Sequence, residues 1–500
     1  MSIDDSDYEG AFYISSPVGV YQASGDTNIS LNYAYKAENL RTDNGVLATC
    51  YGTSLAFPSL WARVDTLCRF YRRTIGDEIF IAVASNSLHY YDLSSGEWMD
   101  IDLDVQLTDG KFTYITYEAV HGEATTDILL LSNVSHGMIA IYGDTLTAEM
   151  VTPKIGDEYE GVKFSCIARY AERIWGVGDP NNPDSVFYSC PYDPLDWTQN
   201  NDNPELGGGV INQPTWDGES FISVNPFGGY LLAIKPSTIY EIRGTDPSSY
   251  TITQGYGCDS AIAPRSIQAD ITNMLYLSQD GIGLYNGTSA ALLSKDALME
   301  TMAGIGNTDL ACSCMCKHVY YLAICVETNG MLPSWNNVLI TYDMDRGAFM
   351  VRTGLCISNL YALNGKVYFT SALGPEYDIC LLGDPDTNGD LGAPIVSTWQ
   401  TAWYDLGRRA QKEDFVLRFT AEATDENTPI WVQIENEKGR TKRKTVMLHR
   451  ARMDYRVRIG MRAKRLRITV QSDASQVTGW KLYGGIDINY TYDSVYEKGV

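Results

Sequence analysis

A strand–turn–strand unit recurs along most of this chain and constrains its fold more than any other feature. One copy is YLSQDGIGLYNG at residues 276–287, with Asp280-Gly281 and Asn286-Gly287 at its turns. Asp-Gly and Asn-Gly favour tight turns between strands, because the central positions of these turns need positive φ. Each unit joins an apolar strand to a second strand that carries Tyr or Phe, and six more copies are found at 78–98, 127–146, 173–190, 230–246, 319–350 and 366–384.

The starts of these seven units lie roughly 40 to 55 residues apart, a spacing typical of propeller blades. We therefore predict an all-β chain with a β-propeller of about seven degenerate blades over residues 45–390. Expected hairpin tips are Asn86-Ser87, Asp280-Gly281 and Asn364-Gly365. Six or eight blades, or two stacked sandwiches, are the alternatives.

The pattern changes at the turn-rich segment LGDPDTNGDLGAP, residues 382–394. Seven or eight longer strands follow in about 105 residues, which predicts a β-sandwich or jelly roll over residues 391–500. Residues 1–44 are expected to form an N-terminal arm or a blade-closing strand. Two short helices are expected at 59–71 and 294–305, the second capped by Ser294.

The charge is distributed unevenly between the two predicted parts. The net charge is −24, yet residues 401–500 hold 19 Lys+Arg against 13 Asp+Glu, a balance of +6, and the first 400 residues carry −30. Residues 438–467 contain 13 Lys+Arg and one acid, Asp454. This basic run predicts a docking surface with the candidate residues Arg440, Lys442, Arg443, Lys444, Arg456, Arg458, Arg462, Lys464, Arg465 and Arg467.

Three interpretations of the basic run compete. Strand alternation places Tyr455, Val457 and Ile459 on one face and Arg456 and Arg458 on the other, so a solvated face is one interpretation. A surface for nucleic acid is the second. Docking on an acidic protein surface is the third, and we favour it over DNA, because the rest of the same chain carries most of the acidic charge.

The cluster CSCMCKH at residues 312–318 suggests a zinc site, but strand geometry argues against one. Cys312, Cys314, Cys316 and His318 alternate, so on a strand all four would share a face. Residues two apart on a strand lie about 6.6 Å from each other, whereas zinc needs every ligand atom within about 2.3 Å. We therefore expect buried free thiols that bind no zinc and form no disulfide with one another.

The segment DPDTNGD offers a weak calcium candidate. Asp384, Asp386, Asn388 and Asp390, with Gly389 at the turn, match the first seven positions of an EF-hand loop. Ile395 stands where the bidentate glutamate belongs, so an ordinary interdomain turn is the competing interpretation. No other cofactor is expected.

We expect no enzymatic activity. The glycines of 281–287 lack the following helix that a nucleotide site needs, and the chain contains no nucleophile elbow, P-loop or HExxH motif. Nothing singles out a carboxylate pair for glycoside cleavage among the 62 acids. The acidic start predicts no secretion signal, no apolar run is long enough to span a membrane, and eleven cysteines without framework spacing favour a reducing compartment.

Three segments resemble one family. NPDSVFYSCPYDPLDW (182–197), IYEIRGTDPSSYTITQGYGCDSAIAPRSI (239–267) with the hairpin that follows it, and the C-terminal WYDLGRRAQK, RLRITV and WKLYGGIDINY are similar to the tail nozzle, or packaged-DNA-stabilisation, proteins of short-tailed bacteriophages. The similarity runs loosely over residues 40–490 and is specific over 173–290.

The resemblance implies a structural virion protein of the tail, assembled in the bacterial host cytoplasm. Such proteins carry a β-propeller and form a ring, a hexamer in this family, below the portal and adaptor rings. The implied partners are further copies of the chain, portal or adaptor proteins, fibre or needle proteins, and DNA that passes without sequence-specific binding. The alternative function is a receptor-binding or polysaccharide-degrading tail protein, which would need a sugar-binding cleft.

Overall fold

The structure is a computed structural model that describes residues 10–23, 29–122, 124–215, 218–257, 262–373, 378–407 and 411–492. The described chain is almost entirely β. Its helices are α1 (Met299–Ala303) and three 3-10 turns, at Pro204–Leu206, Pro264–Ser266 and Thr308–Leu310. None of the helices in these ranges has the length and apolar character needed to cross a membrane.

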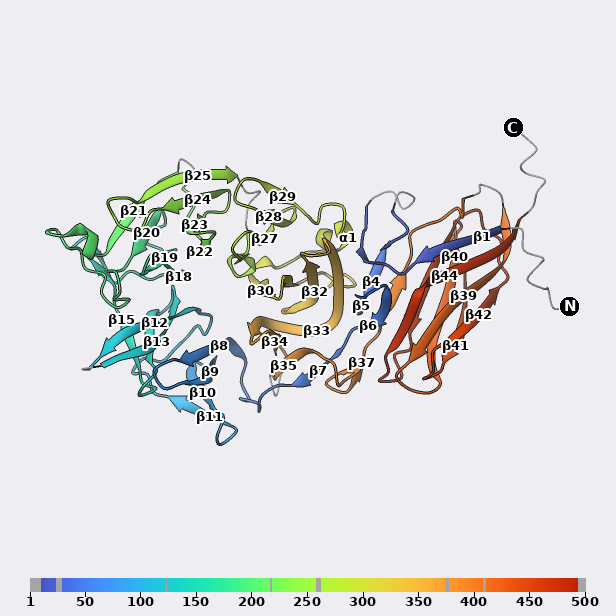
Figure 1. The fold of residues 1–500 in the computed structure, drawn as a ribbon, viewed down its shortest axis with the longest axis horizontal. Coiled ribbons are helices and arrows are strands. Elements are labelled where there is room, and N and C mark those ends of the chain that lie inside the picture. The colour runs from blue at the N-terminus through green and yellow to red at the C-terminus, as the bar shows by residue number, and fades with distance from the viewer. Residues whose placement is uncertain are drawn as a thin grey trace.

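A β-propeller occupies one end of the long axis of the molecule (Figure 1). Its first five blades are separate four-stranded antiparallel sheets. In chain order their strands are β8 (Val64–Arg72), β9 (Asp77–Ala84), β10 (Ser87–Asp92), β11 (Glu97–Ile101); β12 (Thr113–His121), β13 (Ala124–Asn133), β14 (Gly137–Tyr142), β15 (Ala148–Val151); β18 (Cys166–Tyr170), β19 (Arg173–Val177), β20 (Ser185–Tyr188), β21 (Gly209–Asn212); β22 (Ser223–Phe227), β23 (Tyr230–Ile234), β24 (Thr238–Arg243), β25 (Thr251–Gly257); and β26 (Gln268–Ala269), β27 (Met274–Ser278), β28 (Gly281–Tyr285), β29 (Ala290–Leu292).

The sixth and seventh blades share one long strand, β33 (Ala348–Leu363). Its first half pairs with β32 and its second half with β34, with a register shift on each side. The sixth blade is completed by β30 (Cys312–Cys316), β31 (Val319–Ile324) and β32 (Asn336–Asp343), and the seventh by β34 (Lys366–Ser371), β35 (Ile379–Asp384) and β7 (Gly52–Leu55). The prediction of about seven blades is therefore confirmed.

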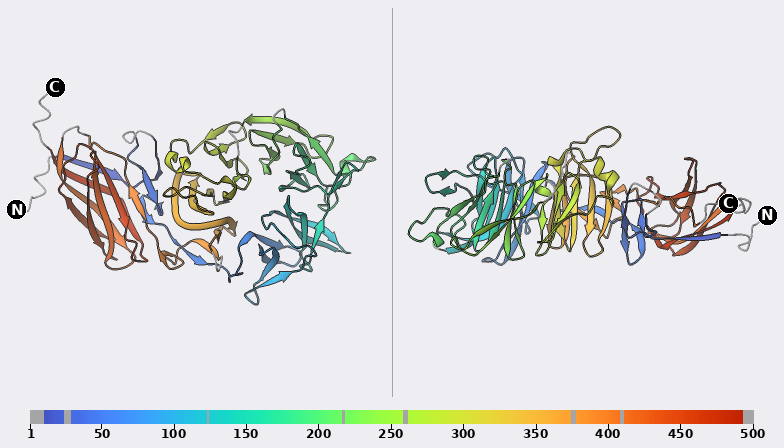
Figure 2. Two further views of the ribbon diagram at one scale, coloured as in Figure 1. Left: turned by 180° about the vertical axis from the view of Figure 1, so that it is seen from behind. Right: turned by 90° about the horizontal axis from the view of Figure 1, so that it is seen from above.

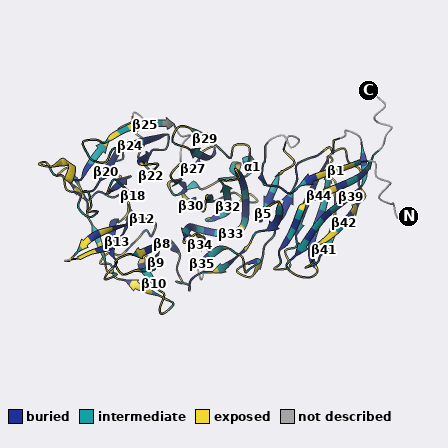
Figure 3. Ribbon diagram, viewed as in Figure 1, coloured by how far each residue is buried: buried dark blue, intermediate teal, exposed yellow. Residues whose placement is uncertain are grey.

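Apolar clusters between neighbouring blades close the propeller into a ring. Each blade shares a buried cluster with the next, including one that joins Val64 and Leu67 of the first blade to Tyr361 and Leu363 of the seventh. Middle strands of the blades such as β20 and β27 are buried along their whole length (Figure 3). A single blade has no partner for its two faces, so stacking around the axis provides the core.

The predicted hairpin tips agree with the structure to within one residue. Asn364 and Gly365 form the tip between β33 and β34, both with positive φ (51° and 70°). The tip predicted at Asn86-Ser87 lies at Ser85 and Asn86, because β10 already begins at Ser87. The tip predicted at Asp280-Gly281 likewise lies one residue earlier, since Ser278 pairs with Gly281.

The helix predicted at 59–71 is wrong. Residues 64–72 form β8, in which Val64, Thr66, Cys68 and Phe70 are buried at a period of two and the backbone pairs with β9. Of the second predicted helix, at 294–305, only the five residues of α1 are helical. Ser294 does not cap this helix, because the buried Ser294 hydroxyl accepts the backbone N–H of Ile282 at 2.8 Å. In both segments, hairpin pairing decides the local structure over helical spacing.

A two-sheet β-sandwich occupies the other end of the long axis, as two further views also show (Figure 2). One sheet has the order β42 (Met453–Ile459), β39 (Lys412–Ala423), β44 (Trp480–Tyr492), β6 (Val46–Thr49), β5 (Leu40–Asp43), with β1 (Gly10–Ser15) also on β44. The other has the order β41 (Thr441–Leu448), β40 (Thr428–Asn436), β43 (Leu466–Ser472), β38 (Thr398–Gln400), β4 (Lys36–Glu38). The remaining short strands are β2 (Gly19–Val20), β3 (Tyr33–Ala34), β16 (Lys154–Ile155), β17 (Tyr159–Glu160), β36 (Gly389–Asp390) and β37 (Ala393–Pro394).

The N-terminal region differs from the expected arm or blade-closing strand over residues 1–44. Strands β1, β4, β5 and β6 lie within the sandwich, and the blade-closing strand is β7, eight residues beyond the expected limit. Residues 1–9 and 24–28 lie outside the described residues. The sandwich is therefore built from both ends of the chain.

The propeller and the sandwich are joined by hydrogen bonds and by a common core. Strand β4 pairs with β38 of the sandwich and, at Glu38, with Val351 of β33. The largest buried cluster runs from Phe415 and Trp399 in the sandwich, through Ala37, to Leu322 and Ile340 in the sixth blade. The two parts are thus packed directly against each other.

We predict that Gly52→Ala destabilises the propeller closure. A Cβ at Gly52 would lie 2.1 Å from the carbonyl oxygen of Gly389, and neither backbone can move without breaking strand pairs. The expected cost is about 1–3 kcal/mol, measured as a lower urea midpoint. Gly460→Ala is the matched control, since its Cβ meets only Asp414 Oδ1, at 3.5 Å. Equal midpoints for the two variants would contradict the close approach.

Candidate functional site

The basic run lies along one edge of the sandwich. β41 and β42 follow each other in the chain, are the edge strands of the two sheets and lie side by side (Figure 1). The Lys442 ammonium donates to the Gly460 carbonyl just beyond β42, which links the two edges. The cations of the basic run, which are close together in the sequence, are therefore partly close together in space as well.

On β41 the register sends the cations to opposite faces. Lys442 and Lys444 pair with Ile434 and Val432, whose side chains are buried in the core. The two lysines share this inner face, but at the edge they are exposed, so their stems border the core and their ammonium groups reach water. Arg443 points the other way, and its guanidinium lies 4.3 Å from the centre of the Trp431 ring.

On β42 the predicted alternation is confirmed. Val457 and Ile459 are buried and Tyr455 is half-buried, whereas Arg456 and Arg458 are exposed on the outer face. Arg458 lies 3.6 Å from Asp414, and both side chains are more than 40% exposed. An exposed pair of this kind contributes less than about 1 kcal/mol, so water and salt can still reach both charges.

A tightly bonded corner gathers most of the remaining cations. The Asn436 amide donates to the Arg462 carbonyl at 3.0 Å, and the Glu437 carboxylate accepts the backbone N–H of Lys464 at 3.0 Å. These bonds hold the β40–β41 turn against the segment before β43. We call the resulting set the basic corner, and its members are Arg440, Lys442, Lys444, Arg462, Lys464 and Arg465.

The structure divides the ten predicted docking residues among three places. Six form the basic corner, and Arg456 and Arg458 lie on the neighbouring outer face of β42. Arg443 and Arg467 lie on the outer face of the other sheet, where Arg467 is half-buried with its guanidinium 4.6 Å from the Tyr35 ring and 4.7 Å from the Trp403 ring. Arg467 thus packs against Tyr35 and Trp403, apart from the basic corner, and its part in docking stays a prediction.

Few acids offset the basic corner. Arg462 pairs with Glu413 at 2.7 Å. In the described part of the chain, no carboxylate forms an ion pair with the other five members: Arg440, Lys442, Lys444, Lys464 and Arg465. Lysines on an edge strand also block the addition of a further strand, so β41 is protected against edge-to-edge aggregation. The corner can therefore attract an acidic surface while repelling a second sandwich.

The loop proposed for calcium is part of the joint between β35 and the sandwich. Asp390 pairs with the buried Arg352 guanidinium, and the Asp384 carboxylate accepts the backbone N–H of Asp386 at 3.1 Å. Asn388 lies beside Gly479. Within the described ranges, no three His, Cys, Asp or Glu side chains are grouped so as to hold a metal ion. A calcium ion here stays a prediction.

The three cysteines of β30 lie on one face, inside the apolar cluster between the sixth and seventh blades. The prediction that His318 shares this face is wrong. His318 lies in the turn after β30 with φ of 61°, and its exposed ring is 3.3 Å from Asp345. Burial raises the pKa of the Cys312 thiol to about 11 and that of Cys314 well above its ordinary value. The thiols are therefore neutral at physiological pH.

We predict that Cys312, Cys314 and Cys316 react slowly with a thiol reagent at pH 8. A raised pKa keeps each group protonated, and only the thiolate attacks. In denaturant all three become reactive, which Ellman titration followed by peptide mapping measures. Rapid native reaction of Cys314, or stoichiometric zinc that is lost in Cys314→Ser, would contradict this assignment.

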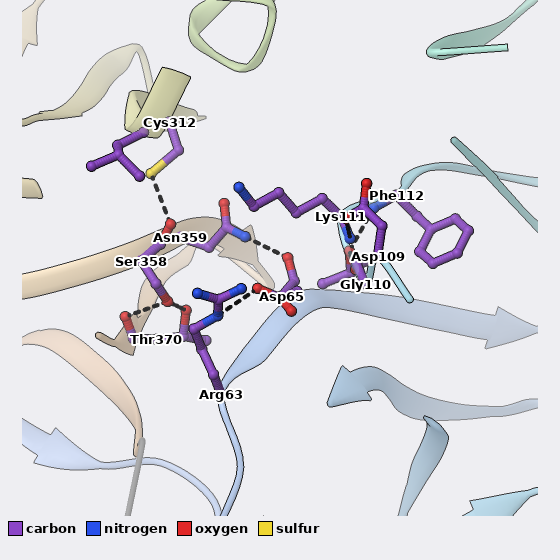
Figure 4. Close-up of polar contacts among 12 residues, drawn as sticks. Arg63, Asp65, Asp109, Gly110, Lys111, Phe112, Cys312, Ser358, Asn359 and Thr370 are labelled. Carbon is purple, nitrogen blue, oxygen red and sulfur yellow. Dashed lines mark hydrogen bonds and ion pairs between the residues drawn. The ribbon is translucent and has the colours of Figure 1, made fainter. Parts of the chain in front are cut away.

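A polar cluster at the centre of the propeller was not anticipated from the sequence (Figure 4). Asn359 of β33 donates to the Asp65 carbonyl of β8, and Arg63 pairs with the Asp65 carboxylate at 2.8 Å. Arg265 in turn donates to Asn359 Oδ1 at 3.1 Å. These bonds link the seventh blade to the first, so the cluster supports ring closure. No motif marks these residues, and Asp65 and Asn359 lie 294 positions apart in the chain.

Comparisons with known proteins do not identify a family. No family model and no curated protein matches the chain. Among solved structures, the chain is similar to U3-55K (10% identity, TM-score 0.40, covering 67% of this chain and 98% of that one) and to the Pan2 WD40 domain of Neurospora crassa (10%, 0.37, 69% and 97%). It is also similar to an exo-β-1,3-galactanase from Phanerochaete chrysosporium (10%, 0.24, 68% and 99%).

Proposed function

We propose that the chain is a non-enzymatic structural subunit of a bacteriophage tail, and that its copies join head to tail in a ring around the DNA exit channel. The observation that carries the proposal is the separation of charge along the long axis. Residues 1–400 carry −30 and residues 401–500 carry +6. Residues 1–44 account for −5 of the −30, so the predicted propeller, residues 45–390, carries −25. Within the N-terminal strands of the sandwich, the charges are paired as Lys36–Glu38 and Arg41–Asp43.

Complementary ends favour contacts between unlike surfaces of identical subunits. Two basic corners repel each other, whereas a basic corner and an acidic propeller attract. A head-to-tail contact of this kind generates a ring when its rotation closes. The rigid joint between propeller and sandwich supports the proposal, since a flexible joint would not fix the rotation.

The place in a virion rests on the resemblance of residues 173–290 to tail nozzle proteins. The partners proposed on that basis are portal or adaptor proteins and fibre or needle proteins. An acidic propeller near the channel would repel DNA phosphates and so leave the passing genome unbound. A receptor-binding or polysaccharide-degrading tail protein is the rival function, and release of reducing sugar from a surface polysaccharide by the purified chain would favour it.

We predict that Lys442→Glu, Lys444→Glu and Arg465→Glu combined prevent self-association. The three side chains are exposed and form no ion pair with any residue that the structure describes, so the folded monomer should persist with an unchanged circular dichroism spectrum. Sedimentation velocity at low salt should show association weakened at least about tenfold, and added salt should weaken wild-type association in the same direction.

The matched control reverses three exposed cations on the propeller, Lys295→Glu, Lys317→Glu and Lys366→Glu. This variant has the same net charge and should associate as the wild type does. Negative-stain images of the wild-type assembly test for rings directly. Equal association of the two triple variants would contradict docking through the basic corner.

A further inference from the structure

A groove lies at the junction of the sandwich and the propeller, away from the basic corner. Its volume is about 360 Å³, within the range of small-molecule sites. The floor is the outer face of β4, β38, β43 and β40, and Thr353 of β33 forms part of the wall. Thr353 is fixed there by two hydrogen bonds with the Asn39 side chain, at 2.9 and 3.3 Å.

The floor consists of two cross-strand rows of side chains. Strand register places Lys36, Gln400, Thr469 and Gln433 in one row, and Glu38, Thr398, Gln471 and Trp431 in the next. The residues between them, such as Trp399, Val470 and Val432, point into the core. The rows therefore form a flat polar surface on a rigid support, with one half-buried indole.

Several groups on this floor have hydrogen-bonding capacity that the protein leaves unused. Gln400 donates to Thr469 at 3.1 Å. In the described ranges, the amides of Gln433 and Gln471 and the indole N–H of Trp431 have no protein partner. Each amide offers two donors and an acceptor, so the two amides and the indole present donors, acceptors and an apolar surface together. Arg443 packs on the Trp431 ring and holds it in place.

We propose that this groove binds an extended β-linked oligosaccharide. Vicinal hydroxyl groups of a sugar match the paired donor and acceptor of a glutamine amide. The C–H groups of a pyranose can pack against the part of the Trp431 indole that Arg443 leaves uncovered. Neighbouring strands are spaced about 4.8 Å apart, close to the repeat of one pyranose unit in an extended chain. In a glycan that crosses β38, β43 and β40, each sugar unit would therefore lie over one strand and contact one side chain of a row. This binding goes beyond the proposed ring function and does not depend on it.

The test is calorimetric titration of the full chain with cellohexaose, mannohexaose and xylohexaose. We expect at least one hexaose to bind, and Gln433→Ala combined with Gln471→Ala to weaken that binding about tenfold or more. Because neither amide has a protein partner, this double variant should unfold at the wild-type temperature. Trp431→Ala should weaken binding similarly, even if it lowers the unfolding temperature.

Two controls separate the groove from other surfaces. Trp61→Ala removes a tryptophan that is 70% exposed on the propeller and should leave affinity unchanged. The double glutamine variant should also associate as the wild type does, so failure of ring assembly and failure of glycan binding are distinguishable. Absence of binding by all three hexaoses, or unchanged affinity in the double variant, would overturn the proposal.

Discussion

The structure depends on how the N-terminal segment is shared between the two halves of the molecule. Within residues 10–55, β1, β5 and β6 pair into one sheet of the sandwich, β4 into the other, and β7 into the seventh blade. The propeller ring is therefore closed by a strand that directly follows β6 of the sandwich and precedes β8 of the first blade. Separation of the two halves would break the β4–β38 and β4–β33 pairs and expose the common core, so strand pairing and burial both oppose it.

Local sequence patterns predicted the blades because each blade is built from hairpins between adjacent segments. Every unit recognised in the sequence corresponds to consecutive strands of one blade, and turn residues such as Asn364 and Gly365 mark the tips. The C-terminal strands were found for the same reason. The strand β8 was mistaken for a helix because its apolar residues satisfy both periods over a short stretch, and only pairing with β9 decides between them.

The pairs between strands that lie far apart in the chain could not be predicted from the sequence. Strand β4 has only three residues and pairs with β38 some 360 positions away, so nothing local distinguishes it from a loop. The basic run was visible from composition, but register divides it: Lys442 and Lys444 share one face while Arg443 and Arg467 belong to the other sheet surface. The groove residues come from five separate segments, and the sequence signal for them is polar alternation at Gln433, Thr469 and Gln471.

The chemistry of the sandwich edge restricts which assemblies the chain can form. An open edge strand normally invites pairing with another edge, but β41 presents Lys442, Arg443 and Lys444 to solvent. A two-fold contact between two sandwiches would bring two basic corners together, in which Glu413 and Glu437 offset only part of the six positive charges. The repulsion would act over about 8–10 Å at ordinary salt. Contacts between unlike surfaces escape this repulsion. In the proposed ring, the cations that oppose pairing at this edge would therefore favour a directional, head-to-tail contact, and the joint at β4 would let every copy repeat the same rotation.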